Sequence, residues 1–220
     1  MPSGSFDSSP FDFSGPQAGP RLVLQSTTTV ELLDRLLAPA DEPAWNELDQ
    51  RYRPVLLGFA KRLGVSDEDA EDVAQETLLR VVRSYAQSFD RERGRLRSWM
   101  IGIARRVVHD LVTGQARRRE IRGESAIVDL PDEDRCEEWI EEECRRAVRV
   151  RALGELAVTT RFDARTIRAF ERVVLGGESP ADVAAALEMS VDSVYTGKHR
   201  CLRELRKIVA RLEPLYELGV

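Results

Sequence analysis

The sequence has little of what metal centres and disulfide frameworks require. It holds only three cysteines and two histidines in 220 residues. Cys136, Cys144 and Cys201 are odd in number and lack Cys-x-x-Cys spacing, and His109 lies far from His199. This pattern argues against a zinc site and against a disulfide framework, and we expect no cofactor. Because Cys201 falls on the apolar stripe of a predicted helix, we expect it to be a buried structural thiol.

Long apolar runs and catalytic motifs are absent as well. No segment approaches the roughly 20 apolar residues that span a bilayer, and the N-terminus lacks a basic stretch followed by an apolar one. The sequence has no Gly-rich phosphate loop ending in Gly-Lys-Ser or Gly-Lys-Thr, and no nucleophile paired with a base. We therefore expect a soluble, cytoplasmic protein that has no membrane contact and no enzymatic activity.

The charge is unevenly distributed along the chain. The net charge of −5 and the pI near 5.3 argue against a protein that holds DNA by bulk electrostatics. Arginines nevertheless concentrate between Arg91 and Arg122, and carboxylates concentrate between Asp129 and Glu143. Such a chain could bind DNA locally and weakly, while a larger partner supplies the remaining affinity.

Apolar residues recur at helical spacing, and no strand-like alternation is visible, so we predict an all-α protein with two small helical domains. Residues 1–27 are rich in Ser, Gly and Pro and predict a disordered tail. The first domain is expected over 28–122, and the second over 147–213. Between them, 123–146 reads as an acidic linker that becomes helical near Trp139.

The C-terminal part has the pattern of a helix-turn-helix. Pro180 suits a first helical position, and Ser179 before it can cap the exposed N–H groups. A short helix to Leu187 is followed by a longer one over 191–212 with an apolar stripe. The opposite face of the longer helix carries hydrogen-bonding and cationic side chains: Ser193, Tyr195, Thr196, Lys198, His199, Arg200 and Arg203. These groups suit base edges and phosphates in a major groove, so this is the predicted recognition helix.

Two residues depart from the usual helix-turn-helix pattern, and a simpler interpretation of the basic face stays open. Glu188 stands where many such turns have Gly, and a positive φ there would cost about 1 kcal/mol. Gly197, inside the recognition helix, either permits close approach of the backbone to DNA or is simply tolerated. The basic side chains could also form only a solvated face of a helical hairpin.

A second motif lies in the first domain. Ser66 with Asp69 three residues on resembles a capping box, and Gly64 closes the helix before it. The stretch that follows, DAEDVAQETLLR from Asp69 to Arg80, resembles the signature helix of region 2 in the bacterial sigma-70 family, specifically the extracytoplasmic-function (ECF) type. The resemblance implies docking on the β′ clamp of RNA polymerase through Asp72, Gln75, Glu76 and Leu79. These four recur at three- and four-residue spacing and so share a helix face, which leaves Val73, Thr77 and Val81 for the core.

The resemblance continues into the arginine-rich stretch and into the helix-turn-helix. The loop FDRERGRL and the helix after it resemble the promoter-melting and minus-ten-reading elements of the family, which implies DNA contacts by Arg91, Arg93, Arg105, Arg106 and His109. Arg106 stands where the family commonly has Asn. Trp99 could stack on bases, but its spacing with Ile103 and Val107 favours core packing. The stretch VYTGKHRCLRELR resembles the final helix of region 4, which reads the minus-thirty-five element.

The match covers about residues 30–212 and implies a promoter-specificity subunit. Its partners would be core RNA polymerase, through the β′ clamp and the β flap, and promoter DNA, with room for an anti-sigma factor. The alternative is an autonomous helix-turn-helix transcriptional regulator, although no heptad seam that would hold a dimer is visible. An adaptor without DNA contact stays open too, and an enzyme has little support.

Overall fold

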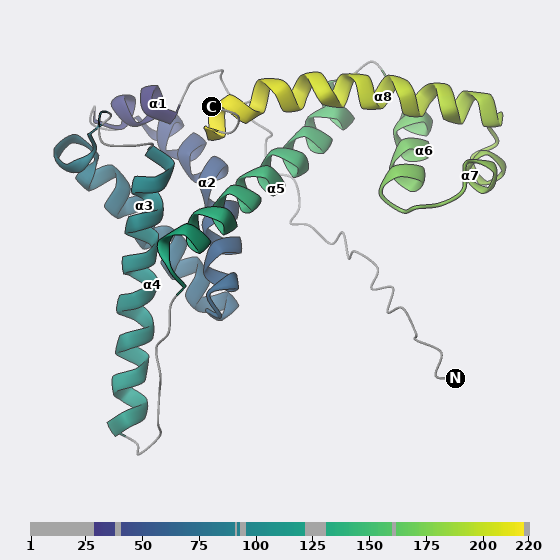
Figure 1. Ribbon diagram of the computed structural model, residues 1–220. Helices are drawn as coiled ribbons and strands as arrows, with labels where there is room; N and C mark the ends of the chain where they lie inside the picture. The colour runs from purple at the N-terminus through teal and green to yellow at the C-terminus, as the bar shows by residue number, and fades with distance from the viewer. Residues whose placement is uncertain are drawn as a thin grey trace, which may run out of the picture.

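The computed structural model describes residues 29–37, 41–90, 92, 96–121, 131–159 and 162–217. Within these ranges all regular structure is helical, which confirms the all-α prediction (Figure 1). The elements in chain order are α1 (Thr29–Leu36), α2 (Glu42–Arg62), α3 (Asp67–Ser88), α4 (Leu96–Ile121), α5 (Glu133–Thr159), α6 (Ala164–Val174), α7 (Pro180–Ala186), α8 (Val191–Leu212) and the 3-10 turn η1 (Glu213–Tyr216). Among these described helices, none is both long and apolar enough to cross a membrane. The predicted tail, 1–27, lies outside the described residues.

Side chains at the helix starts form the predicted caps. Ser66 accepts a hydrogen bond from the backbone N–H of Asp69 at 3.2 Å, and its hydroxyl donates to the Asp69 carboxylate at 2.8 Å. Ser179 caps α7 in the same way, with Pro180 in the first turn. Gly64 follows α2 with a φ of +79°, a backbone conformation that favours glycine. The helix boundaries therefore follow from local chemistry.

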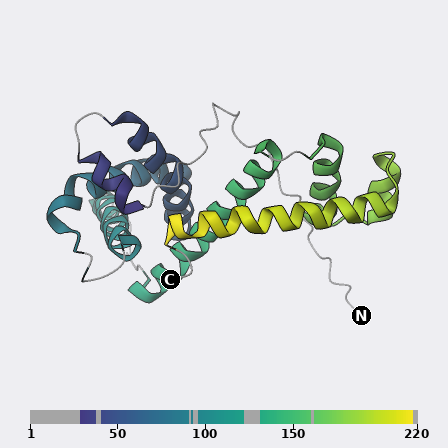
Figure 2. The same ribbon diagram turned by 90° about the horizontal axis from the view of Figure 1, so that it is seen from above.

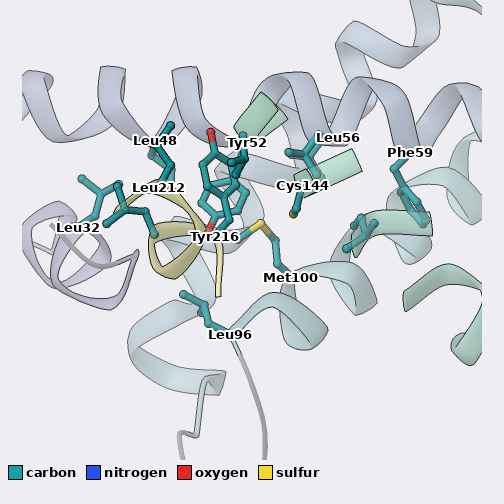
Figure 3. Close-up of a cluster of buried hydrophobic side chains, with 14 of the residues drawn as sticks. Leu32, Leu48, Tyr52, Leu56, Phe59, Leu96, Met100, Cys144, Leu212 and Tyr216 are labelled. Atoms are coloured by element: carbon teal, nitrogen blue, oxygen red, sulfur yellow. The ribbon is translucent and has the colours of Figure 1, made fainter. Parts of the chain in front are cut away.

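The helices α1 to α4 pack around a core built on α2. Figure 3 shows Tyr52, Leu56 and Phe59 of α2 in one row, and each is at most 2% exposed. Leu96 and Met100 of α4 complete this part of the core. Full burial of such a side chain contributes roughly 1.5–3 kcal/mol relative to exposure. This core fixes the positions of α3 and α4, which carry the predicted polymerase and minus-ten surfaces.

The acidic stretch is helical over most of its described part. Residues 122–130 lie outside the structure's description, and from Glu133 the chain forms the single helix α5. Cys136, Ile140 and Cys144 are buried in the same core as α2, because their four-residue spacing makes an apolar stripe within an acidic sequence. The predicted linker thus contains the first half of a packed helix. The domain boundaries stay a prediction.

A buried carboxylate holds α5 close to α2. Glu143 is 4% exposed and pairs with Arg62 at 2.8 Å. A Cβ on Gly58 would stand only 2.2 Å from Oε2 of Glu143, so the glycine makes room for this side chain. This contact holds the middle of α5 against the helices α1 to α4, which we call the first bundle.

The helices α6, α7 and α8 form the predicted helix-turn-helix region. Its separate small core consists of Ala169, Val183, Ala184 and Val194. Glu188 in the turn has a φ of +51°, so this residue adopts the left-handed conformation in which many such turns have Gly. Gly197 is buried against α6, where a Cβ would stand 3.1 Å from Cγ2 of Thr166. Gly197 therefore allows α6 to cross α8 closely.

The long helix α8 connects this region with the first bundle. Figures 1 and 2 show it running from α7 across the C-terminal part of α5 to the end of the first bundle. Cys201 is buried as predicted, and burial raises the pKa of its thiol to about 11. Leu212 and Tyr216 lie near Leu48 and Tyr52 in the core of Figure 3. The two regions share one continuous core through α8 and η1.

Candidate nucleic-acid interface

The recognition face of α8 is open to solvent. The helix begins at Ser190, which accepts a hydrogen bond from the backbone N–H of Ser193 at 3.1 Å. Val194 and Cys201 point into the protein, at 2% and 0% exposure. The predicted reading residues are exposed, except for Lys198, which is half-buried at the edge of the apolar stripe. The burial pattern thus leaves a polar, cationic face available for a ligand.

Three of the seven reading residues line a groove. It has a volume of about 910 Å³ and lies between the start of α6, the turn before α8 and the first half of α8. Ser193, Thr196 and Arg200 form its α8 wall. The other four predicted residues, Tyr195, Lys198, His199 and Arg203, do not line it. The structure therefore divides the predicted reading face into a groove wall and an outer surface.

The opposite wall contains residues that the sequence analysis did not single out. Asp163 and Arg165 come from the start of α6. Nearby, the guanidinium of Arg200 lies over the ring of Phe162, 5.1 Å from its centroid. A cation over an aromatic face at this distance is attracted by the ring quadrupole. The N-cap pattern of α6 was a usable signal for Asp163, whereas the Phe162 contact joins segments far apart in sequence.

The groove carries charges of both signs. Arg165 and Arg200 face carboxylates of Asp163, Glu188 and Asp192 within the same lining. Asp163 accepts hydrogen bonds from the Thr166 backbone N–H at 2.8 Å and from its hydroxyl at 2.9 Å. These bonds hold the pKa of Asp163 below its ordinary value, so it is an anion at neutral pH. Phosphate attraction at this groove is therefore partly offset by local negative charge.

The predicted minus-ten surface on α4 is only partly free. Arg106 and His109 are exposed, but Nη2 of Arg105 donates to the carbonyl of Pro131 at 2.9 Å. Arg105 thereby links α4 to a residue just before α5. To contact DNA, its guanidinium would have to keep this hydrogen bond or give it up. Arg91 and Arg93 lie outside the described residues.

Trp99 belongs to an aromatic group at the start of α4. Its ring lies 5.5 Å from that of Phe89 and 6.5 Å from that of Tyr85, measured between centroids. The side chain is half-buried and packs against the main core. This arrangement agrees with the core role that its spacing favoured, because the neighbouring rings occupy part of its surface.

The predicted polymerase face on α3 is accessible. Asp72 and Gln75 are exposed, and Glu76 and Leu79 are half-buried. On the opposite side of α3, Val73, Thr77 and Val81 are buried, as expected. The four predicted contacts therefore lie together on a solvent-facing surface of the first bundle.

This face is connected to the predicted DNA surface on α4. Arg80 donates to Glu76 at 2.7 Å and to Asp110 at 3.2 Å. Asp110 follows His109 directly in α4. One guanidinium thus joins a predicted polymerase contact to the helix that carries the predicted minus-ten contacts. A partner that engages Glu76 would compete with Arg80 for the carboxylate.

Part of the chain matches a known protein family. Sigma-70 region 2 matches residues 48–118, which include α3 and most of α4. The ECF RNA polymerase sigma factor SigE of Mycolicibacterium smegmatis is 28% identical over 172 residues, covering 77% of this chain and 63% of the relative. The ECF RNA polymerase sigma factor SigL of Mycobacterium tuberculosis is 28% identical over 183 residues, covering 83% of this chain and 95% of the relative.

The similarity extends beyond the region 2 match, because both relatives align over more than three quarters of this chain. The aligned part nevertheless spans less than two thirds of the length of SigE. Residues 48–118 thus match sigma-70 region 2, and the chain as a whole is similar to RNA polymerase sigma factors of the ECF type.

Proposed function

We propose that the chain is a promoter-specificity subunit of bacterial RNA polymerase. It binds core polymerase through the exposed face of α3, reads the upstream promoter element with α8, and contacts the downstream element through α4 and the loop before it. In this role it performs no catalytic step of its own and acts in the cytoplasm, where polymerase and chromosome are found.

The observation that carries the proposal is the coexistence of two separate exposed surfaces on one chain. The α3 surface lies within the part that matches sigma-70 region 2, and the α8 surface lies in a helix-turn-helix outside that match. An initiation subunit needs both, because it must hold polymerase and recognise DNA at the same time. The first bundle would meet the β′ clamp, and the helix-turn-helix region would meet the β flap. An anti-sigma factor would act by covering one of these surfaces.

An autonomous regulator is less well supported by the groove at α8. Such a protein would hold its operator without help, yet the groove lining contains Asp163, Glu188 and Asp192 beside two arginines. Local carboxylates weaken phosphate binding. Dependence on a larger partner for affinity follows directly from this charge balance.

The proposal is tested by binding to purified core RNA polymerase from Mycolicibacterium smegmatis, the source of one relative. The Asp72→Ala, Glu76→Ala double variant should lose at least about tenfold in affinity, since central interface side chains commonly contribute 1 kcal/mol or more each. The circular dichroism spectrum should stay unchanged because neither residue belongs to the core.

A matched control exists on α5. Asp134 and Glu138 are likewise an Asp and a Glu spaced four apart on a helix, and both are exposed. The Asp134→Ala, Glu138→Ala variant should bind polymerase like the wild type. Equal losses in both variants, or no binding by the wild-type chain, would reject the proposed α3 interface.

A further inference from the structure

A groove lies between α2 and α5. It has a volume of about 410 Å³, and it contains none of the polymerase or DNA contacts that were assigned within the described part of the chain. Its apolar lining includes Pro54 and Leu57 of α2 and Ala147 and Val150 of α5. Pro54 is exposed, and Val150 is 59% exposed. The groove therefore presents apolar side chains to solvent that the proposed function does not use.

The charged part of the groove lining is mostly cationic. Lys61, Arg146 and Arg151 line it together with one carboxylate, Glu143. Glu143 is 4% exposed and already pairs with Arg62 at 2.8 Å. Lys61 and Arg151 have carboxylate partners of their own, but the side chain of Arg146 is 64% exposed and lies 3.7 Å from Glu143. The groove therefore suits a ligand that is both apolar and negatively charged.

The N-terminal tail contains a segment of this composition. Residues 6–13 read FDSSPFDF and lie outside the described part of the chain. They hold three of the chain's seven phenylalanines and two carboxylates: Phe6, Phe11, Phe13, Asp7 and Asp12. Segments that stay disordered are usually poor in aromatic residues, so three rings this close together indicate a segment that binds a surface.

We propose that residues 6–13 bind in the groove between α2 and α5 of the same chain. In an extended segment, Phe11 and Phe13 lie on one side, about 7 Å apart. The groove follows α2 from Pro54 to Lys61, which is about 10 Å, so it is long enough for both rings. The carboxylates of the segment complement the cations of the groove lining.

The tail enters the described structure beside this groove. Thr29, the first described residue, donates to the carbonyl of Leu215 at 2.8 Å, and the next residue, Tyr216, lines the groove. A flexible chain of about 16 residues, as between Phe13 and Thr29, has a root-mean-square length of about 22 Å. A linker of this kind gives an effective concentration in the millimolar range. A contact too weak to hold a free peptide can therefore be occupied within the chain.

The docking can be followed by paramagnetic broadening of the backbone amide signals of the isotopically labelled full-length chain. A nitroxide is attached through Gln17→Cys, just after the proposed contact, and the three native cysteines stay unmodified because they are 0% exposed. Broadening should be strong at Gly58 and Val150, which line the groove. It should be weak at Gly177, in the loop between α6 and α7 at the other end of the molecule (Figure 1).

Two variants remove the contact from opposite sides. Phe11→Ala with Phe13→Ala should lower the docked population at least about tenfold, because losing half of the burial of one ring corresponds to about a factor of three or more. Val150→Asp places a carboxylate in the groove and should abolish the broadening at Gly58. Val158→Asp is the matched control, since Val158 is 58% exposed on the same helix and does not line the groove, and it should keep the wild-type broadening.

The charges contribute a smaller effect. Asp7→Asn with Asp12→Asn should lower the docked population about threefold, because exposed ion pairs are weak. Should Val150→Asp fail to fold, the phenylalanine variant still decides, since it changes none of the described residues. Broadening that is no stronger at Gly58 than at Gly177, or that persists in the phenylalanine variant, would overturn the proposal.

The origin of the bound segment is tested by mixing two preparations of the chain. One carries the isotope without the nitroxide, and the other carries the nitroxide without the isotope. Docking within one chain predicts no broadening at Gly58 in this mixture. Broadening there would mean that the tail of a second copy occupies the groove, and it would overturn docking within the same chain.

Discussion

The main core built on α2 and the small separate core of the helix-turn-helix region consist of side chains of different size. The bundle encloses large residues such as Tyr52 and Phe59, and it also encloses the charged Arg51 at 0% exposure. The separate core of the helix-turn-helix contains only alanine and valine among its buried members. The small core therefore depends more on a close approach of its helices than the main core does.

The arginine side chains of these two regions have different structural roles. In the bundle, buried Arg51 pairs with Glu47 at 2.6 Å and Arg105 donates to the carbonyl of Pro131, so both serve the fold. On α8, Arg203 is exposed, and Arg200 is exposed beside a ring. A cluster of arginines in the sequence is thus weak evidence for DNA contact in the bundle and stronger evidence on α8.

The largest effect is expected in the core of the bundle. Phe59→Ala should lower the free energy of unfolding by about 3–5 kcal/mol, because it removes a fully buried ring and leaves a cavity. Val183→Ala in the small core should cost about 2 kcal/mol. Urea denaturation of the full-length variants measures both. Equal losses in the free energy of unfolding for the two variants would contradict the proposed difference between the two cores.

Close packing in the helix-turn-helix predicts the next effect. Gly197→Val should cost about 1–3 kcal/mol, since the new side chain pushes Thr166 and α6 away from α8. Gly154→Val is the control, because a Cβ at this helical glycine of α5 meets nothing within 4 Å. The control should stay within about 0.5 kcal/mol of the wild type in thermal unfolding. A Gly197→Val chain as stable as the control would show that α6 does not need this close approach.

The turn before α8 should gain from a glycine. Glu188→Gly should raise the free energy of unfolding by about 1 kcal/mol, because it relieves the positive φ. Glu188→Ala removes the same carboxylate but keeps the strained backbone, so it should not share this gain. Chemical denaturation of both variants separates strain from charge. A stabilisation of equal size in the two would assign the effect to charge.

The smallest expected effect is a pH dependence of unfolding that arises from Asp163 at the start of α6. The pKa of Asp163 is lower in the folded chain because Thr166 donates to its carboxylate. The cap's contribution is therefore complete above the ordinary pKa of an aspartate, and it is lost as the pH falls through the folded value. Asp163→Asn can still cap the helix without titrating, so its unfolding should depend less on acid pH. Identical acid unfolding curves for the two chains would reject this role.

Much of the helical framework could be predicted because its signals are local. The caps Ser66 and Ser179, the turn residue Glu188 and the apolar stripe of α8 all depend on residues within a few positions of one another. The acidic composition concealed the packed helix α5, since the stripe of Cys136, Ile140 and Cys144 lies between carboxylates.

The functional surfaces were less predictable because they depend on contacts between distant segments. The sequence does not indicate that Arg105 donates to the carbonyl of Pro131, or that Arg200 lies over the ring of Phe162. It also does not indicate the hydrogen bond from Thr29 to the carbonyl of Leu215. Each contact is set by how helices pack after they form. Exposure on α3 and α8 followed from periodicity, whereas the availability of each side chain for a partner required the three-dimensional arrangement.

The central claim is that this chain gives core polymerase its promoter selectivity through α8. The direct measurement is binding of reconstituted holoenzyme to a library of upstream elements at several salt concentrations. Arg200→Ala and Arg203→Ala should each relax the preference at one upstream base pair by about 1–3 kcal/mol, whereas Lys198→Ala should weaken all sequences about equally and reduce the salt slope by roughly one unit. Unchanged base preference in both arginine variants would contradict the claim and leave the basic face of α8 as a solvated surface.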